Sequence, residues 1–271
     1  MTNHLFPALL KYWRGRNGQS QLDLGLSAGV SARHISFLET GRARPSEEMV
    51  LLLMSALGAP LRDQNEALRA AGFSPRFAEP DLDAISPAVN WAVERMLQQQ
   101  EPYPLTLLSA DYRIMKSNNA ARRVFEQFVA EPAQLAKQLD MFSLVFDPAL
   151  ARPFIVDWPL LARRMLTRLH RETLKSRSDL RLRSLLERTL RFPDVQAEWR
   201  HPDFGVDIES TLNVWLQKGD LTAGFMTTLT MFSSPALVTL EELRIESYFP
   251  LDGRTRELCE RLASGGPAVN G

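Results

Sequence analysis

The chain has 271 residues, of which 45% are hydrophobic and 24% charged, and its formal net charge is zero. These values are ordinary for a water-soluble globular chain of roughly two domains at ~150 residues each, and they exclude a protein that is basic throughout. The single cysteine, Cys259, excludes a disulfide framework, and the four histidines lack ligand spacing, so no metal site or cofactor is expected. Since no run approaches ~18 apolar residues and no signal-peptide order begins the chain, we expect a cytoplasmic protein without a membrane span.

Five short helices are predicted in about the first 72 residues, which indicates a compact all-α domain. Apolar residues at helical spacing and flanking turn residues place them at residues 5–16, 21–27, 32–39, 47–57 and 61–71. Ser20 and Ser31 are each placed to cap the helix that follows, by accepting hydrogen bonds from its free N–H groups. Gly29 fits a left-handed turn between the second and third helices, and Gly72 closes the fifth.

The first 45 residues are locally basic, with six lysines and arginines against two acidic residues. Several motifs in this part resemble the Xre/Cro/C1-type helix-turn-helix of bacterial and phage repressors. These motifs are Ser20-Gln21, Ala28-Gly29-Val30-Ser31, Ile35-Ser36, Glu39-Thr40-Gly41-Arg42 and Pro45-Ser46. The resemblance covers residues 9–72 and implies a DNA-binding domain that is lambda-repressor-like. In such a domain the third helix, residues 32–39, enters the major groove of double-stranded DNA.

The resemblance and the chemistry of base edges together give a set of candidate DNA-binding residues. Arg33 can pair with guanine O6 and N7, and Ala32 or Phe37 can contact a thymine methyl group. Two alternatives stay open, because Arg33 could be a solvated surface side chain and Phe37 could be a core residue. The resemblance also implies a structural ion pair between Arg14 and Glu39. The DNA-binding candidates are Gln21, Ser31, Ala32, Arg33, His34, Ser36, Phe37, Arg42 and Arg44.

A proline-rich stretch, residues 74–87, predicts a linker between the DNA-binding domain, residues 1–73, and a second domain, residues 88–264. Helices are predicted at 88–100, 120–128, 159–175, 179–191, 195–200 and 254–263, and strands at 102–108, 112–116, 206–217, 221–231 and 238–248. This order is that of an α+β PAS-like domain, in which a five-stranded antiparallel sheet and its helices enclose a pocket. Residues 265–271 are expected to form a disordered tail.

Motifs in the second half resemble regulators in which an MmyB-like ligand-binding domain follows an Xre-type DNA reader. They are Glu101-Pro102-Tyr103-Pro104, Asn118-Asn119-Ala120, Asp157-Trp158 and the segments 238–240 and 246–250. The resemblance implies a transcription regulator that senses a small apolar acid, such as a fatty acid. The cation for that acid would be Arg164, beside Arg163 and Arg168, although these could instead form a solvated basic face. The candidate pocket walls are Tyr103, Leu105, Met115, Phe125, Phe142, Phe154, Trp158, Arg164, Met165 and Phe225.

Other function classes stay open from the sequence alone. The helix-turn-helix could be a protein-interaction module that does not contact DNA, and the second domain could be a small-molecule carrier or an enzyme. The sequence contains no nucleophile-elbow, phosphate-loop or His-Glu-x-x-His motif, so no enzyme is expected. The family and the two-fold symmetry of operator DNA together imply a homodimer.

Overall fold

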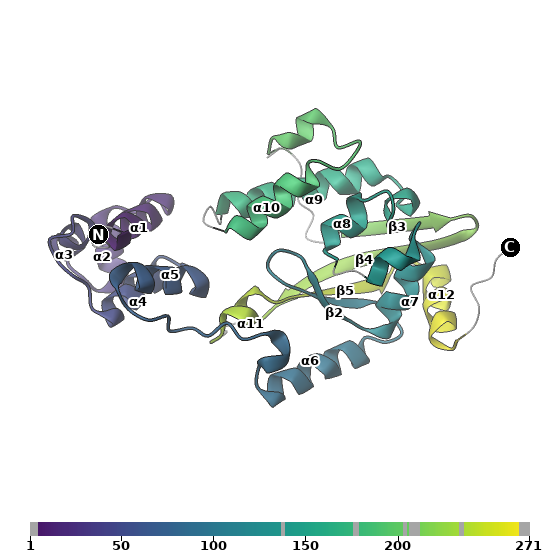
Figure 1. Ribbon diagram of the computed structural model, residues 1–271, viewed down its shortest axis with the longest axis horizontal. Coiled ribbons are helices and arrows are strands. Elements are labelled where there is room, and N and C mark those ends of the chain that lie inside the picture. The colour runs from purple at the N-terminus through teal and green to yellow at the C-terminus, as the bar shows by residue number, and fades with distance from the viewer. Residues whose placement is uncertain are drawn as a thin grey trace. The chain divides into compact units, whose positions relative to one another are not determined.

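The computed structural model describes residues 5–136, 139–175, 179–202, 205, 212–232 and 236–265 (Figure 1). Two compact units share this chain. The first comprises the chain up to Ala84 and a second, separate segment that ends at Glu241. The other comprises the chain from Ile85 to Phe232 and from Glu242 onward. Within the described residues, no helix is long and apolar enough to cross a membrane.

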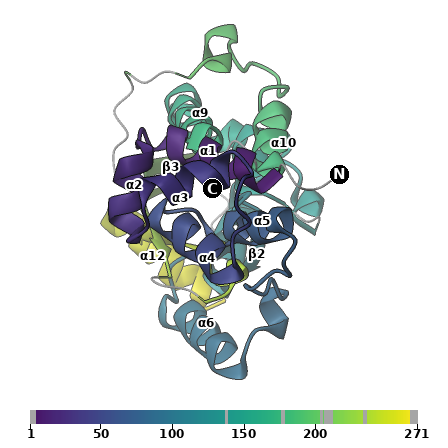
Figure 2. The same ribbon diagram turned by 90° about the vertical axis from the view of Figure 1, so that its left-hand side faces the viewer.

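The N-terminal unit is a bundle of helices, drawn in purple and blue in Figure 2. Within residues 5–84 its α-helices are α1 (Leu5–Arg16), α2 (Gln21–Ala28), α3 (Ala32–Glu39), α4 (Glu47–Ala56) and α5 (Leu61–Ala71). The predicted five-helix domain is therefore confirmed. The predicted caps are also present, because Ser20 Oγ accepts from Asp23 N and Ser31 Oγ accepts from His34 N. Gly29 and Gly72 end α2 and α5 in the left-handed conformation that glycine adopts without strain.

Part of the predicted linker is tied to this helical bundle. The buried side chain of Asn65, in α5, accepts hydrogen bonds from Arg76 N and Phe77 N and donates one to Phe77 O at 2.7 Å. A buried amide whose donor and acceptor are both satisfied fixes the backbone that it touches. The chain just after α5 is therefore held in place at 76–77.

The strand predicted at 238–248 is wrong in its first half. Helix α11 (Val238–Glu242) occupies that half, and the strand β5 begins only at Arg244. The backbone N–H of Val238 donates to Ala78 O, and Thr239 Oγ1 donates to Pro80 O at 2.6 Å. These bonds to a distant segment of the chain replace a sheet ladder. A Val-Thr pair is typical of strands, and no local pattern indicates a partner about 160 positions away.

Helix α11 also supplies a cap to α5. Pro60 precedes α5 and makes no side-chain capping bond, so the first N–H of the helix lacks a local acceptor. Glu241 Oε2 accepts that hydrogen bond from Leu61 N at 2.7 Å, across 180 positions of sequence. The carboxylate also lies at the positive end of the helix dipole, where negative charge is stabilising.

The second unit is built on an antiparallel sheet, as predicted. In the described part of the chain this sheet has five strands in the order β2-β1-β5-β4-β3. They are β1 (Leu105–Leu108), β2 (Ile114–Ser117), β3 (Leu212–Lys218), β4 (Leu221–Met231) and β5 (Arg244–Pro250). Thr106 pairs with Glu246, and Thr227 pairs with Tyr248. Directly paired residues share a face of the sheet, so these four side chains lie on one side. Residues 206–211 of the predicted third strand lie outside the described residues.

Helices cover the sheet and complete the core of the second unit. They are α6 (Pro87–Gln99), α7 (Asn119–Gln127), α8 (Met141–Phe146), α9 (Trp158–Lys175), α10 (Leu180–Thr189) and α12 (Gly253–Ala263). Figure 1 shows α8, α9 and α10 on one side of the sheet and α6 on the other. Helix α8 was not predicted, because five of its six residues are apolar and a uniformly apolar run has no helical period. The predicted tail lies outside the described residues beyond Gly265.

Candidate DNA-binding helix and ligand pocket

A polar cluster fixes helices α1, α2 and α3 to one another. Arg14 Nε and Nη2 donate to the two carboxylate oxygens of Glu39, at 2.6 and 3.0 Å, and Gln21 Nε2 donates to Glu39 Oε2 at 2.8 Å. The Glu39 side chain is 3% exposed, so its charge is compensated in a nearly buried position. The predicted Arg14–Glu39 pair is confirmed. Burial works to raise the pKa of Glu39, but the hydrogen bonds from Arg14 and Gln21 outweigh it and lower that pKa.

Gly25 lets α2 approach the start of α3 closely. A Cβ atom at this position would lie 2.5 Å from Val30 O and 3.3 Å from Ala32 N, both of them backbone atoms. We expect Gly25→Ala to lower the free energy of unfolding by about 1–3 kcal/mol, because backbone must move to admit the methyl group. Gly15→Ala is the matched control, since a Cβ there meets nothing within 4 Å. Gly15→Ala should raise the free energy of unfolding by as much as about 1 kcal/mol, because alanine has the higher helix propensity. Chemical denaturation measures both, and equal gains in stability would contradict the close packing.

The outer side of α3 carries an exposed cation over an aromatic ring. Arg33 is exposed and its Cζ lies 5.3 Å from the centre of the Phe37 ring. Phe37 is half-buried, while Ile35 and Leu38 on the inner side are fully buried. Phe37 is therefore not a buried core residue, and the prediction that it lies on the outer side of the helix is the one that remains. Ala32, His34 and Ser36 are half-buried on the same short helix.

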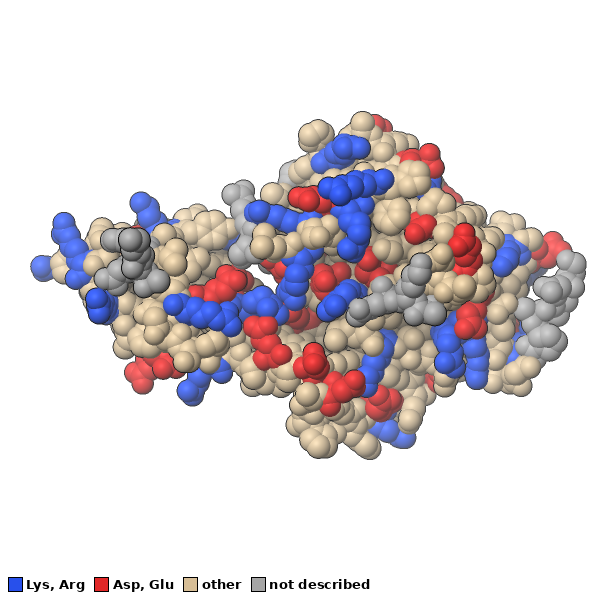
Figure 3. Space-filling view, in the orientation of Figure 1, with Lys and Arg blue, Asp and Glu red and all other residues tan. Residues whose placement is uncertain are grey.

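Two more exposed arginines, Arg42 and Arg44, follow α3 in the loop before α4. Within the described residues, no ion pair involves Arg33, Arg42 or Arg44. Figure 3 shows basic side chains at the left edge of the view, where Figure 1 labels α3. Cations without an internal partner are available to phosphate oxygens, which supply most of the affinity in DNA binding.

Two of the candidate DNA-binding residues make hydrogen bonds within the bundle. The Gln21 side chain donates to Glu39, and the Ser31 side chain caps α3. Their side chains are thus committed to the bundle. A helix N-terminus can bind a phosphate through its backbone N–H groups alone.

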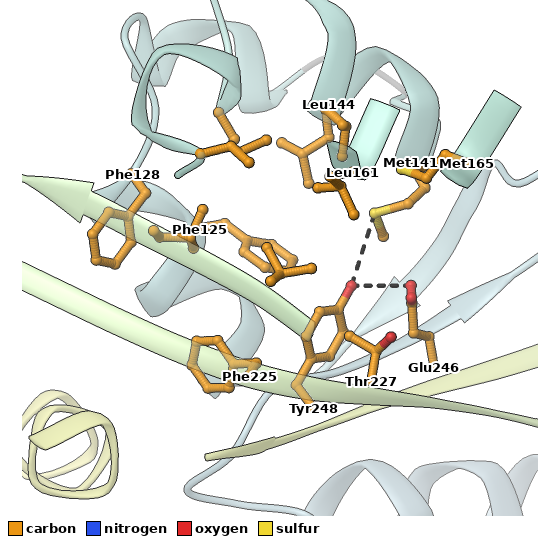
Figure 4. Close-up of a pocket in the computed structure, with 15 residues that line it drawn as sticks. Phe125, Phe128, Met141, Leu144, Leu161, Met165, Phe225, Thr227, Glu246 and Tyr248 are labelled. Atoms are coloured by element: carbon orange, nitrogen blue, oxygen red, sulfur yellow. Dashed lines mark hydrogen bonds between the residues drawn. The ribbon is translucent and has the colours of Figure 1, made fainter. Parts of the chain in front are cut away.

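A cavity of about 70 Å³ lies inside the second unit, between the sheet and the helices above it (Figure 4). Its lining is almost wholly apolar, and Figure 4 shows Phe125 and Phe225 facing it from α7 and β4. The lining residues are Phe125, Phe128, Met141, Leu144, Val145, Ala151, Ile155, Leu161, Met165, Val214, Leu216, Phe225, Thr227, Glu246 and Tyr248.

Three of the predicted wall residues line this cavity, namely Phe125, Met165 and Phe225. Most of the others belong to the packed core around it. Trp158 donates from Nε1 to Val145 O, and Phe142 stacks on Phe146, so their rings are used in packing. Arg164, predicted as the cation for an acid, is not among the lining residues. The predicted wall residues outside this cavity are Tyr103, Leu105, Met115, Phe142, Phe154, Trp158 and Arg164.

Glu246 and Tyr248 of β5 lie at the polar end of the cavity, and neither was among the predicted wall residues. Tyr248 Oη donates to Glu246 Oε2 at 3.0 Å and lies 3.8 Å from Met141 Sδ (Figure 4). Burial raises the pKa of Glu246, an effect that the Tyr248 hydrogen bond and the charge of Arg168 only partly oppose. The alternation Arg-x-Glu-x-Tyr at 244–248 could have shown that these side chains share one face of a strand.

Two arginines near this polar end share a single carboxylate, that of Glu172. Glu172, in α9, accepts hydrogen bonds from Tyr112 Oη at 2.7 Å, Arg168 Nε at 3.2 Å and Arg244 Nη1 at 3.0 Å. The guanidinium of Arg244 also stacks on Tyr112, with Cζ 4.4 Å from the ring centre. This Glu172 cluster therefore ties α9 to β5 and to the turn before β2, and it shares its acidic charge between two cations.

A second cavity of about 270 Å³ lies beside the first, and Phe125 lines both. Its walls include Met115, Leu139 and the basic residues Lys116 and Arg122. Met115, predicted as a pocket wall, therefore faces this cavity. Thr106 is fully buried there, and its Oγ1 has no hydrogen-bond partner in the part of the chain that the structure describes.

A family model described as the MmyB-like transcription regulator ligand binding domain matches residues 89–262, more than half of the chain. The chain belongs to the MmyB-like transcription regulators. A second model, described as a helix-turn-helix domain, matches residues 6–68. This regulator thus joins a DNA-binding helix-turn-helix to a ligand-sensing domain, which confirms the resemblance read from its motifs.

Comparison with curated proteins finds no match for this regulator. One solved structure that matches it is described as an RNA-binding Light-Oxygen-Voltage Receptor, with 10% sequence identity and a TM-score of 0.28. The match covers 94% of this chain and 64% of the receptor chain. A likeness this weak carries no argument about fold or function. Among the described residues, no group of three or more His, Cys, Asp or Glu side chains could hold a metal ion.

Proposed function

We propose that this regulator binds specific DNA sequences through α3 and that occupancy of the apolar cavity changes that binding. The observation that carries the first half is the arrangement of α3. Ile35 and Leu38 anchor one side of the helix in the core, and Arg33 projects from the other with no ion pair in the described residues. An exposed arginine on a short, firmly seated helix suits bidentate contact with a guanine edge.

The proposal assigns separate roles to the arginines near α3. Arg33 reads a base, while Arg42 and Arg44 contact backbone phosphates that set the position of the helix. We further propose an Xre-type homodimer, in which two copies of α3 occupy major grooves about one turn of DNA, ~34 Å, apart. The ligand acts only through a difference in its affinity for two arrangements of that dimer.

Replacing Arg33 tests the base-reading role. We expect Arg33→Ala to weaken binding to the preferred site by about 1–3 kcal/mol and to broaden the base preference at one position of each half-site. Sites would first be selected from random DNA with the full chain, and affinities then measured across single-base variants. Arg42→Ala is the contrast, since it should weaken all sequences alike and reduce the salt dependence by about one phosphate contact.

Three results would overturn this assignment. A uniform loss in Arg33→Ala would show that Arg33 contacts phosphate rather than a base. Binding to selected DNA that does not fall with salt would remove the electrostatic basis of the interaction and favour a protein-interaction module. A protein that binds its selected site as a monomer in sedimentation experiments would contradict the proposed homodimer.

The sensing half of the proposal rests on the apolar cavity beneath the helices of the second unit. Its lining suits the hydrocarbon tail of a fatty acid, the ligand class that the family resemblance implies, but the described lining residues offer its carboxylate no cation. Met141 and Met165 line the cavity, and their flexible side chains can adapt its shape to such a tail. Native mass spectrometry of the full chain, followed by DNA affinity with and without the bound molecule, tests whether a ligand is sensed.

A further inference from the structure

Helix α11, which lies between β4 and β5, belongs as far as Glu241 to the N-terminal unit, and the chain returns to the second unit at Glu242. Glu241 Oε2 accepts from Leu61 N of α5 at 2.7 Å, and two further hydrogen bonds fix α11 to the backbone at residues 78 and 80. The two strands on either side of α11 both supply residues to the lining of the apolar cavity. One continuous segment therefore caps a helix of the DNA reader and forms part of the sensing cavity.

Alternate residues after Glu241 are tied to the helices of the second unit. Glu242 accepts from Arg181 Nη2 at 2.9 Å and from Nη1 at 3.1 Å, so a bidentate ion pair holds it to α10. Two positions later, Arg244 donates to Glu172 of α9 at 3.0 Å. The next two alternate residues of β5 line the cavity itself. The path from the cavity to the cap of α5 is thus a single short stretch of backbone with anchored side chains.

Strand β5 is a stiff part of this path. It pairs with β1 on one side and with β4 on the other, so its register is fixed by two ladders. Close-packed interiors transmit strain, so a displacement of β5 at the cavity is carried along the strand toward α11. On the other side of the joint, α5 packs against α1, which Arg14 bonds to Glu39 at the end of α3.

We infer that the adjacent carboxylates of Glu241 and Glu242 form the joint through which occupancy of the cavity changes DNA binding. Glu242 holds the joint to the sensing unit through Arg181, and Glu241 transmits its position to α5 through Leu61 N. The inference rests on the proposed function and adds the residues that carry the regulation. Both glutamates are positioning residues, because neither lines the cavity and neither is a candidate for DNA contact.

Exchange of the Leu61 amide hydrogen, followed by NMR in the full chain, tests the joint without a ligand. Glu241→Ala should speed this exchange about fivefold through loss of one capping bond, and Glu241→Gln, which keeps an acceptor oxygen, should restore most of the protection. Arg181→Met should speed it about threefold, although Arg181 belongs to the second unit. Arg188→Met is the matched control, because it breaks an ion pair of the same helix with Asp140 and should leave the Leu61 amide unchanged.

The regulatory role is tested with hexanoate, a short acid of the proposed ligand class, and DNA selected by the full chain. Excess hexanoate should change the DNA affinity of the native protein by at least about fivefold, and DNA should change hexanoate affinity by the same factor. Glu241→Ala and Arg181→Met should still bind hexanoate in calorimetry, but its effect on DNA affinity should fall below about twofold. Ser46→Ala removes the cap of α4 in the same reader and should keep the effect.

The outcomes separate this inference from the proposed function. Equal exchange of the Leu61 amide in Arg181→Met and Arg188→Met would overturn the joint, whatever the ligand is. A hexanoate effect on DNA affinity that survives in both Glu241→Ala and Arg181→Met would also overturn it, and the sensing function would stand. Hexanoate that does not bind, or that binds the native chain without changing its DNA affinity, would contradict the proposed sensing of such acids, while the exchange measurement still decides on the joint.

Discussion

Replacing Glu39 with alanine is expected to lower the free energy of unfolding of the N-terminal unit by about 3 kcal/mol, because one nearly buried partner of an ion pair is removed and the other keeps its charge. Arg14 would lose both hydrogen bonds at 2.6 and 3.0 Å, and Gln21 would lose its acceptor. Since these bonds join α1 and α2 to the end of α3, DNA affinity should fall with stability. Amide hydrogen exchange across α1–α3 in the full chain measures the loss.

The control is an exposed pair in the same unit. Arg62 and Glu79 lie 2.7 Å apart, with side chains about a third exposed, so Glu79→Ala should cost no more than about 1 kcal/mol. The double variant Arg14→Ala, Glu39→Ala should recover part of the loss, because it leaves no uncompensated charge. Equal losses in the Glu39 and Glu79 variants would contradict the special role of the buried pair.

The Glu39 carboxylate also makes the stability of the N-terminal unit depend on pH in the acid range. The pKa of Glu39 is lower in the folded chain than in the unfolded chain, where a glutamate titrates near ~4.3. Its contribution to stability is therefore complete above that value and is lost as the pH falls through the lower, folded pKa. Glu39→Gln should flatten this part of the stability profile below about pH 5, and an unchanged profile would show that other groups carry it.

The second large effect is expected at Glu172, the acceptor shared by Tyr112, Arg168 and Arg244. We expect Glu172→Ala to lower the free energy of unfolding of the ligand-binding unit by about 3 kcal/mol, because Arg244, whose side chain is 14% exposed, would lose its counter-charge. The released Arg168 would also add positive charge near Glu246. Hexanoate should then bind more tightly than it does to the native protein, which calorimetry can measure.

A surface pair again provides the comparison. Lys116 and Glu94 lie 3.1 Å apart in the same unit, and Glu94 is 51% exposed, so Glu94→Ala should cost about 1 kcal/mol or less. If Glu172→Ala costs no more than this, the cluster is not a stabilising element. If it destabilises the unit without any change for hexanoate, the arginines do not influence the cavity.

The N-terminal helices were predictable almost to the residue because their ends carry local signals. Ser20 and Ser31 start helices by bonding an N–H three positions on, and Gly72 ends one by its left-handed conformation. These interactions lie within a few residues of the helix that they terminate. A single sequence therefore contains all that is needed to place such helices and, with them, Arg33 on the outer side of α3.

The pocket could not be placed in the same way, because its position depends on long-range pairing. Glu246 and Tyr248 face the cavity only because β5 pairs with β1 and β4 in one register, and a shift by one residue would turn both away. The helical start of the segment at Val238 depends on Ala78, about 160 positions earlier. Aromatic and methionine residues were sensible wall candidates, yet a core and a cavity wall have the same composition.

The helix α11 has a consequence for how this chain matures during synthesis. The five N-terminal helices leave the ribosome first, but the acceptor for Leu61 N, Glu241, is translated 180 residues later. A chain moving at ~5–20 residues per second needs about 10–40 seconds to supply it. Until then the first N–H of α5 has only water as its acceptor, so the newly made DNA reader lacks this cap. The cap is supplied only after β4 has been translated, which ties the full stability of the reader to synthesis of the sensing domain.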